Sequence, residues 1–347
     1  MPTRRRFLKN AFGAGAGLAL AAQHSHWAAA QTLAASQLER NKAVALRYKE
    51  TMNRRAATDE FFAPGYKRLR AGLRHLANNA RDQGFPSPGT GLRDSIPDRM
   101  DVIEEVIADG DKVGLLWRLT GTHQGDLYGI PPTGRKIDIY ELGILRLANG
   151  KITEAWFMAD EAGLLRQLGA ALPPRKDSRL IVPEPSNTGE DPDVVVRRLK
   201  SKPPVSMEDR NKVVVANSKI SAPTSTDRTP DYRQRRFGFQ HLRDYGVARG
   251  VAEFNITRAF PDRRDRVDEL LAESEKVWMQ FELVGTHTVS LYGLPPTGKR
   301  VEAPEIGIMR IVDGKWKESW YFGDELGLLL QLDILQVLRG LPASPVA

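Results

Sequence analysis

The chain of 347 residues contains no cysteine. This absence excludes disulfides, thiolate metal ligands and thiol nucleophiles. Long apolar runs are also missing, because the most apolar stretch, Ala11 to Ala22, falls short of the roughly 20 residues that a helix needs to span a bilayer. What the chain does contain is a distinctive start and a long internal repeat.

The first thirty residues have the pattern of a targeting segment. Thr3 to Lys9 reads TRRRFLK, a short apolar run follows, and Ala28 to Ala30 precede Gln31. This pattern predicts a twin-arginine signal peptide over residues 1–30, cleaved after Ala30, with the twin-arginine translocase as a partner during export. The expected destination is the periplasm or the exterior. An uncleaved membrane anchor is the alternative, which the shortness of the apolar run disfavours.

The basic character of the chain lies largely in that segment. The formal net charge is +8, and removal of its four basic residues leaves +4. This modest excess gives no argument for a nucleic-acid partner.

A long stretch of sequence occurs twice. Residues 121–168 align without a gap with residues 285–332, and 25 of the 48 positions are identical. A repeat of this length is a whole domain rather than a solenoid unit. We therefore predict a first domain over 31–171, a Pro- and charge-rich linker over 172–206, and a second domain over 207–347.

The periodicity of the first copy predicts helices followed by strands. Helices are expected over residues 37–51, 58–62 and 69–79, and a short one follows the strands at 161–169. Strands are expected over 102–108, 113–123, 136–147 and 151–159, separated by turn signals such as Asn149-Gly150. The order indicates an α+β fold with an antiparallel sheet in each copy.

Strand parity identifies polar residues that break apolar faces in both copies. Glu141 lies on the face of Ile137, Ile139 and Leu145, and Glu305 repeats it. A buried charge there must find a partner, shift its pKa or line a cavity. The same test selects three further twin pairs, which with the glutamates could converge on one concave surface: His123/His287, Trp156/Trp320 and Asp160/Asp324.

Structural roles compete with functional ones at these positions. His123 could be a satisfied histidine at a strand end, and Asp160 could cap the helix that follows it. Glu154 near a turn could be solvated. Arg70 and Arg236 could bind an acidic ligand, or belong to a solvated, Arg-rich helix face.

Several motifs resemble one known family. Copy one reads GTHQG at 121–125, IPPTG at 130–134 and DEAGLLRQL at 160–168. Copy two reads GTHTV, LPPTG and DELGLLLQL at the equivalent positions, with Thr288-Val289 in place of Gln-Gly. The chain resembles the SnoaL-like polyketide cyclase family of the nuclear transport factor 2-like superfamily. This resemblance implies two tandem cone domains, each a curved antiparallel sheet packed on N-terminal helices, with a pocket inside.

The resemblance also implies a chemistry and a site. It implies cofactor-free acid/base catalysis on a small apolar carbonyl compound by a lyase, isomerase or cyclase. Asp160 and Asp324 would move the proton and His123 and His287 would orient the carbonyl. Each pocket would be lined by a Glu, a Trp and a Tyr: Glu141, Trp156 and Tyr128, or Glu305, Trp320 and Tyr292. A partly apolar pocket is expected to raise the pKa of its carboxylate toward neutrality.

Two other functions remain open at this stage. A non-catalytic protein could hold an apolar ligand or another protein in its cones. Metal chemistry is disfavoured, because each copy offers one suitably placed His.

Relatives that pair through their sheets imply an internal pseudo-dimer of the two halves. Polyketide cyclisation itself fits export poorly, since those substrates are made in the cytosol.

Overall fold

The computed structural model describes residues 36–339, apart from 82–87, 187, 202–205 and 253–254. The signal-peptide prediction for residues 1–30 lies outside these ranges. Among the described residues, no helix combines the length and apolar character needed to cross a bilayer.

The first unit consists of helices around one five-stranded sheet. A helix over residues 36–53 is followed by a 3-10 turn, η1, and by strand β1. Two short helices, α2 and α3, precede four strands and a closing helix, α4. The bounds are η1 Asp59–Phe61, β1 Phe62–Arg70, α2 Arg74–Ala80, α3 Pro88–Ser95, β2 Met100–Asp109, β3 Lys112–Thr122, β4 Lys136–Ala148, β5 Lys151–Ala159 and α4 Glu161–Leu168.

The second unit repeats this order after an extra helix. Helix α5 lies in the segment expected to be a linker, and its Val195 and Val196 are buried in the second unit's core. The bounds are α5 Pro192–Lys200, α6 Met207–Asn217, η2 Ser225–Asp227, β6 Arg228–Arg236, α7 Gln240–Val247, α8 Ile256–Ala259, β7 Arg266–Glu273, β8 Lys276–Thr286, β9 Arg300–Val312, β10 Lys315–Gly323, α9 Glu325–Leu332 and α10 Gln336–Arg339.

Both sheets have the same topology. Their strand orders are β1-β5-β4-β3-β2 and β6-β10-β9-β8-β7. The four strands expected in copy one are confirmed as β2 to β5, and the α+β class is correct. The fifth, edge strand of each sheet was missed; β1 pairs parallel with β5, and β6 pairs parallel with β10. The helix expected over 69–79 begins only at Arg74, because Leu69 and Arg70 belong to β1.

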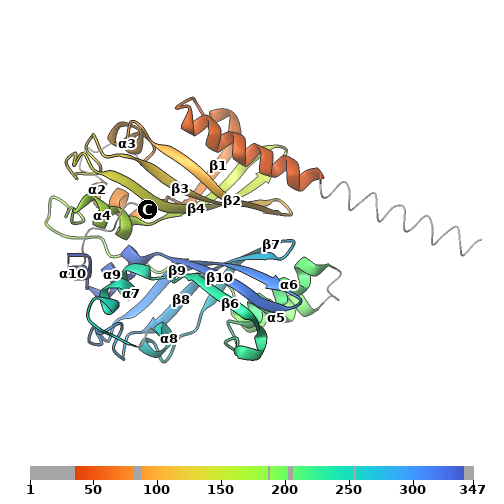
Figure 1. Ribbon diagram of the computed structural model, residues 1–347. Coiled ribbons are helices and arrows are strands. Elements are labelled where there is room, and N and C mark those ends of the chain that lie inside the picture. Colours follow the sequence, from red (N-terminus) through yellow and green to blue (C-terminus); the bar gives the residue numbers. More distant parts are fainter. Residues whose placement is uncertain (1–35, 82–87, 187, 202–205, 253–254, 340–347) are drawn as a thin grey trace, which may run out of the picture.

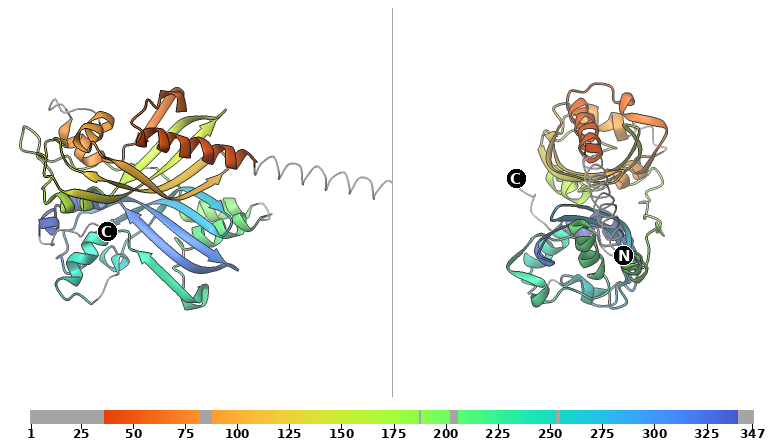
Figure 2. Two further views of the ribbon diagram at one scale, coloured as in Figure 1. Left: turned by 45° about the horizontal axis from the view of Figure 1, so that its top comes forward. Right: turned by 90° about the vertical axis from the view of Figure 1, so that its right-hand side faces the viewer.

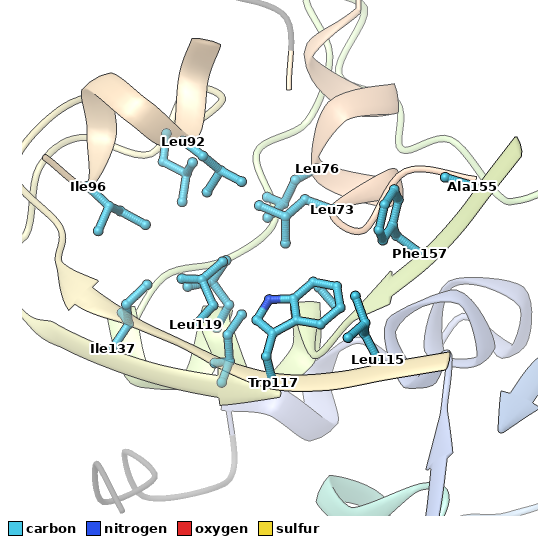
Figure 3. Packing of buried hydrophobic residues seen from close by; sticks show 14 of the residues in the cluster. Leu73, Leu76, Leu92, Ile96, Leu115, Trp117, Leu119, Ile137, Ala155 and Phe157 are labelled. Atoms are coloured by element: carbon cyan, nitrogen blue, oxygen red, sulfur yellow. The ribbon is translucent and has the colours of Figure 1, made fainter. Parts of the chain in front are cut away.

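The strands of each sheet bury side chains on both faces. On β3, Leu115, Trp117 and Leu119 point into the cone and meet α2 and α3, as Figure 3 shows, whereas Leu116 belongs to a different cluster on the outer face. A sheet covered on both sides needs apolar residues at successive positions, so parity alone cannot identify its concave face.

The outer faces of the two sheets pack against each other. In Figures 1 and 2 the sheets lie between the two sets of helices. One apolar cluster joins both units; its members include Leu142, Ile144 and Met158 from the first unit and Trp278, Ile306 and Phe322 from the second. Reciprocal bonds frame this interface, since Glu273 accepts from Ala108 and Asp109 accepts from Ala272.

Candidate active site

A charged cluster lies inside the first cone, beside Trp117. The Lys49 Nζ lies 2.8 Å from Asp101 Oδ2 and 3.1 Å from the centroid of the Trp117 ring. Arg99 donates to both oxygens of Asp101, at 2.9 and 3.1 Å. The Glu141 carboxylate lies 3.7 Å from the Arg99 guanidinium and accepts no hydrogen bond from the described residues.

The two carboxylates of this cluster differ in charge state. Burial alone would raise the pKa of Asp101, but Lys49 and Arg99 outweigh it and lower that pKa to about 2. Burial raises the pKa of Glu141, against the opposing attraction of Lys49 and Arg99. Asp101 is therefore a permanent anion that pairs with Lys49 and Arg99, whereas Glu141 keeps a proton to a higher pH than an ordinary glutamate.

The second cone repeats the four charged residues of the cluster, with Phe281 in place of Trp117 beside the lysine. Lys219 and Arg263 pair with Asp265 at 2.7 Å each, and Arg263 lies 3.7 Å from Glu305. Burial raises the pKa of Glu305 to about 7, opposed by Arg263 and Lys219. The Oε1 atom of Glu305 is buried and has no hydrogen-bond partner within the described part of the chain. Unsatisfied buried carboxylates with shifted pKa values are typical of functional sites.

A glycine makes room for each of these glutamates. A Cβ at Gly72 would lie 1.9 Å from Glu141 Oε1, and one at Gly238 would lie 2.0 Å from Glu305 Oε2. Any other residue at these two positions would push the carboxylate out of place. The close approach of a glycine to the glutamate is therefore built into both copies.

The histidines of the GTH motif clamp the PPTG loop. The Nδ1 atom of His123 lies 3.1 Å from Thr133 Oγ1 and accepts from the Thr133 amide at 3.3 Å. His287 and Thr297 repeat this pair at 3.1 and 3.2 Å. Burial lowers the pKa of both histidines, so they are neutral near pH 7. The Nδ1 atoms are thus engaged by the loop, whereas the buried Nε2 atoms of His123 and His287 have no hydrogen-bond partner among the described residues.

The aspartates selected from the sequence lie at the interface between the units. Asp160 caps α4 by accepting from Gly163, and also contacts His241 at 3.0 Å and Arg236 at 3.4 Å. Asp324 caps α9 in the same way. It contacts His75 and Arg70 of the first unit, each at 2.8 Å.

The prediction of a raised pKa for these aspartates is wrong. Burial alone would raise the pKa of Asp160, but His241 and Arg236 outweigh it and hold that pKa well below the usual range. His75 and Arg70 do the same for Asp324. Arg70 and Arg236 therefore belong to partly or fully buried ion pairs, and not to a solvated helix face.

The residues expected on one concave surface are divided between two regions. Glu141 lines the cone, and Tyr128 and Tyr292 belong to the apolar clusters of the two cones. Trp156 and Trp320 instead pack against the cluster between the sheets. The sequence missed Lys49, Arg99, Asp101 and the second-cone residues Lys219, Arg263 and Asp265, although Arg99 and Asp101 recur at the constant offset of 164.

In the described part of the chain, no group of three or more His, Cys, Asp or Glu is placed to hold a metal ion. The chemistry visible in each cone is that of a lysine, an arginine and two carboxylates.

Two cones, each with a curved sheet closed by helices over a buried acidic and basic cluster, define the chain as a tandem α+β protein of the nuclear transport factor 2-like fold. The profile of the SnoaL-like polyketide cyclases matches residues 42–168 and 223–332. The chain belongs to the SnoaL-like polyketide cyclase family.

Individual relatives agree with this assignment. Nogalonic acid methyl ester cyclase of Streptomyces nogalater is 36% identical over 95 residues, which are 26% of this chain and 71% of the relative. Aklanonic acid methyl ester cyclase of Streptomyces peucetius is 35% identical over 68 residues, 19% of this chain and 47% of the relative. These relatives support a cyclase- or isomerase-type role in general.

Solved structures are also similar to this chain. A SnoaL-like polyketide cyclase from Agrobacterium tumefaciens has 20% identity and a TM-score of 0.30, covering 37% of this chain and 98% of its own. TsrD from Streptomyces laurentii has 23% identity and a TM-score of 0.28, covering 40% and 96%.

Proposed function

We propose that the chain is an acid/base enzyme that moves a proton next to the carbonyl of a small, largely apolar compound, as in a cyclisation or isomerisation. The observation that carries this proposal is the pair Glu141 and Glu305. Each is a buried carboxylate with a raised pKa that accepts no hydrogen bond from the described residues, held beside an arginine and opposite a glycine.

The residues of one cone are sufficient for the proposed proton transfer. The carboxylate of Glu305 takes a proton from the carbon next to the carbonyl, and the electron pair of the broken C–H bond moves into the enolate. Arg263 and Lys219, which pair with Asp265 beside Glu305, stabilise the negative oxygen; Arg263 is the stronger of the two, because burial lowers the pKa of Lys219. The proton then returns to a carbon or an oxygen of the product. Glu141, Arg99 and Lys49 would do the same in the first cone.

The test measures exchange of the α-protons of 2-tetralone for deuterium, and cyclisation of nogalonic acid methyl ester. Glu141→Gln/Glu305→Gln is expected to lose both activities. Unchanged turnover would overturn the proposal. The double variant Asp160→Asn/Asp324→Asn tests the assignment made from the sequence, in which those aspartates carry the proton.

We also propose that the chain is exported with its first 30 residues removed. The support is the TRRRFLK sequence at Thr3–Lys9, followed by Ala28 to Ala30. Arg4→Lys/Arg5→Lys is expected to keep the full-length chain in the cytosol, whereas the native chain should appear outside it, beginning at Gln31. Fractionation with mass spectrometry of the mature N-terminus checks this. Equal export of both forms would contradict it.

A further proposal is that the two halves act as an internal pseudo-dimer, so that the mature chain is a monomer in solution. The support is the burial of both outer sheet faces in one shared cluster. That contact leaves these faces unavailable to a second chain. Light scattering across a concentration series is expected to give the mass of one chain, and an obligate dimer would refute the proposal.

A further inference from the structure

A cavity of about 370 Å³ opens between the two units, away from the interior of either cone. Trp156, Ile144 and Leu69 line it from the first unit and Pro304 from the second, and these side chains give it apolar walls. Its volume lies at the lower end of the range of small-molecule sites, which is roughly 300–1,000 Å³. We call it the Trp156 groove.

The internal repeat places a second cavity, of about 330 Å³, at the equivalent position beside Trp320. Many lining residues correspond at the offset of 164, including Ile144/Ile308, Lys112/Lys276 and Arg146/Arg310. We call this cavity the Trp320 groove. A lining residue that differs between equivalent positions therefore distinguishes one groove from the other.

The polar lining of the Trp156 groove includes the carboxylates of Glu154, Asp268, Glu269 and Glu282, and two of its other polar residues have no counterpart in the Trp320 groove. Gln280 lines the Trp156 groove, whereas the equivalent residue of the Trp320 groove is Leu116. Arg74 lines it too, whereas its twin Gln240 hydrogen-bonds to Asp244 at 2.9 Å. The Trp156 groove thus has an amide and a guanidinium where the other has a leucine and an amide engaged elsewhere.

Both of these polar side chains lack partners within the described residues. Gln280 is only 8% exposed, and its amide forms no hydrogen bond with another described residue. The amide borders the cavity, where it can bond to a partner such as water or a ligand. Because Gln280 lines the cavity, that partner would occupy the groove.

Arg74 is the cation of the groove that forms no ion pair with another described residue. Arg146 pairs with Glu154, Lys112 with Glu269, and Arg70 with Asp324. Burial, and then the like charge of Arg70, lower the pKa of Arg74, against the attraction of Asp324, Glu161 and Glu282. A ligand carboxylate beside Arg74 would offset the repulsion from Arg70, since a guanidinium binds a carboxylate in a bidentate manner.

We propose that the Trp156 groove binds a small planar aromatic carboxylate. Its carboxylate pairs with the Arg74 guanidinium, and a hydroxyl or keto group beside the carboxylate bonds to the Gln280 amide. Its ring lies against Trp156 and the apolar walls. This is a second ligand site, and it does not depend on the chemistry proposed for the cones.

The test is calorimetric titration of the full chain with 1-hydroxy-2-naphthoate. Saturable binding is expected. Arg74→Gln should weaken it at least tenfold, and Gln280→Leu should weaken it about fivefold, the range expected for loss of a charged and a neutral hydrogen bond. Both substitutions install the residue found in the other half of the chain, so the folded state should persist, which thermal melting checks.

Two controls separate this site from general attraction. Arg235→Gln removes a cation from the Trp320 groove and is expected to leave the affinity unchanged. 2-Naphthol, which lacks the carboxylate, should bind at least tenfold more weakly and be indifferent to Arg74→Gln. The proposal is overturned if naphthoate does not saturate the protein, if Arg74→Gln and Gln280→Leu bind like the native chain, or if Arg235→Gln weakens binding equally. Turnover in the tetralone assay should not respond to these variants, so this site and the cone site can fail separately.

Discussion

Replacing Asp324 with alanine is expected to lower the free energy of unfolding by about 3–5 kcal/mol, the usual cost of breaking a buried ion pair by removing one partner. The side chains of Arg70 and His75 are 3% and 1% exposed, and both would lose their carboxylate. Helix α9 would lose its N-terminal cap as well, because Asp324 accepts from Gly327 at 3.0 Å. Urea denaturation followed by circular dichroism measures the loss.

Asp160→Ala is the matched control for this effect. Asp160 makes the same contacts with the second unit, but its side chain is 13% exposed and Arg236 lies farther away, at 3.4 Å. The loss at Asp160 should therefore be smaller than that at Asp324. Losses below about 1 kcal/mol at both positions, the value of an exposed ion pair, would contradict the role assigned to this interface.

The pH dependence of the interface follows from the same contacts. The pKa of Asp324 is held below its ordinary value of 3.8, so the stability it contributes is present above pH 3.8 and is lost as the pH falls through the folded value. Burial opposes the charged form of His241, but Asp160 and Glu325 outweigh it and raise its pKa above 6.5. The stability from His241 is therefore present below pH 6.5 and is lost as the pH rises through the folded value. The contacts of Asp324 and His241 therefore contribute most to stability between pH 3.8 and pH 6.5.

The sequence predicted the central strands well because their apolar patterns and turn signals are local. It failed at β1, whose residues FAPGYKRLR include a proline, a glycine and three basic side chains. As an edge strand β1 has its partner β5 on one side, so the apolar pattern that reveals a central strand is absent.

The candidate site was predicted in part for a related reason. Glu141 and Glu305 were found because a charge interrupts a strand face that is otherwise apolar. The partners of Asp160 and Asp324 could not be found, since His241 and His75 lie in the other half of the chain. A contact over 249 residues leaves no periodic signal. The apolar pattern of the strands also could not show which face of a sheet is concave, because the packing of the two units buries the outer face as well.

The largest effect on activity is expected from Glu141→Gln/Glu305→Gln, which should slow α-proton exchange by about 10²- to 10⁴-fold, the usual contribution of a general base. Glutamine keeps the size of the side chain and cannot accept the proton, so the fold should persist. With Glu305 titrating at about pH 7, the activity of the second cone, measured in Glu141→Gln, should rise with pH and level off above that value. At pH 5 it should fall to about one hundredth of the plateau, because a base two pH units below its pKa is about 1% ionised.

Two further variants, Glu305→Gln and Asp160→Asn/Asp324→Asn, complete the test of which carboxylates carry the proton. Glu305→Gln removes the carboxylate whose pKa is about 7, and the activity that remains then belongs to the first cone and Glu141. Asp160→Asn/Asp324→Asn should lower stability while the pH profile of turnover keeps its midpoint, because those carboxylates titrate far below neutrality. If the aspartate variant loses turnover while it is fully folded, and the glutamate variant keeps it, the proton is carried at the interface and not inside the cones.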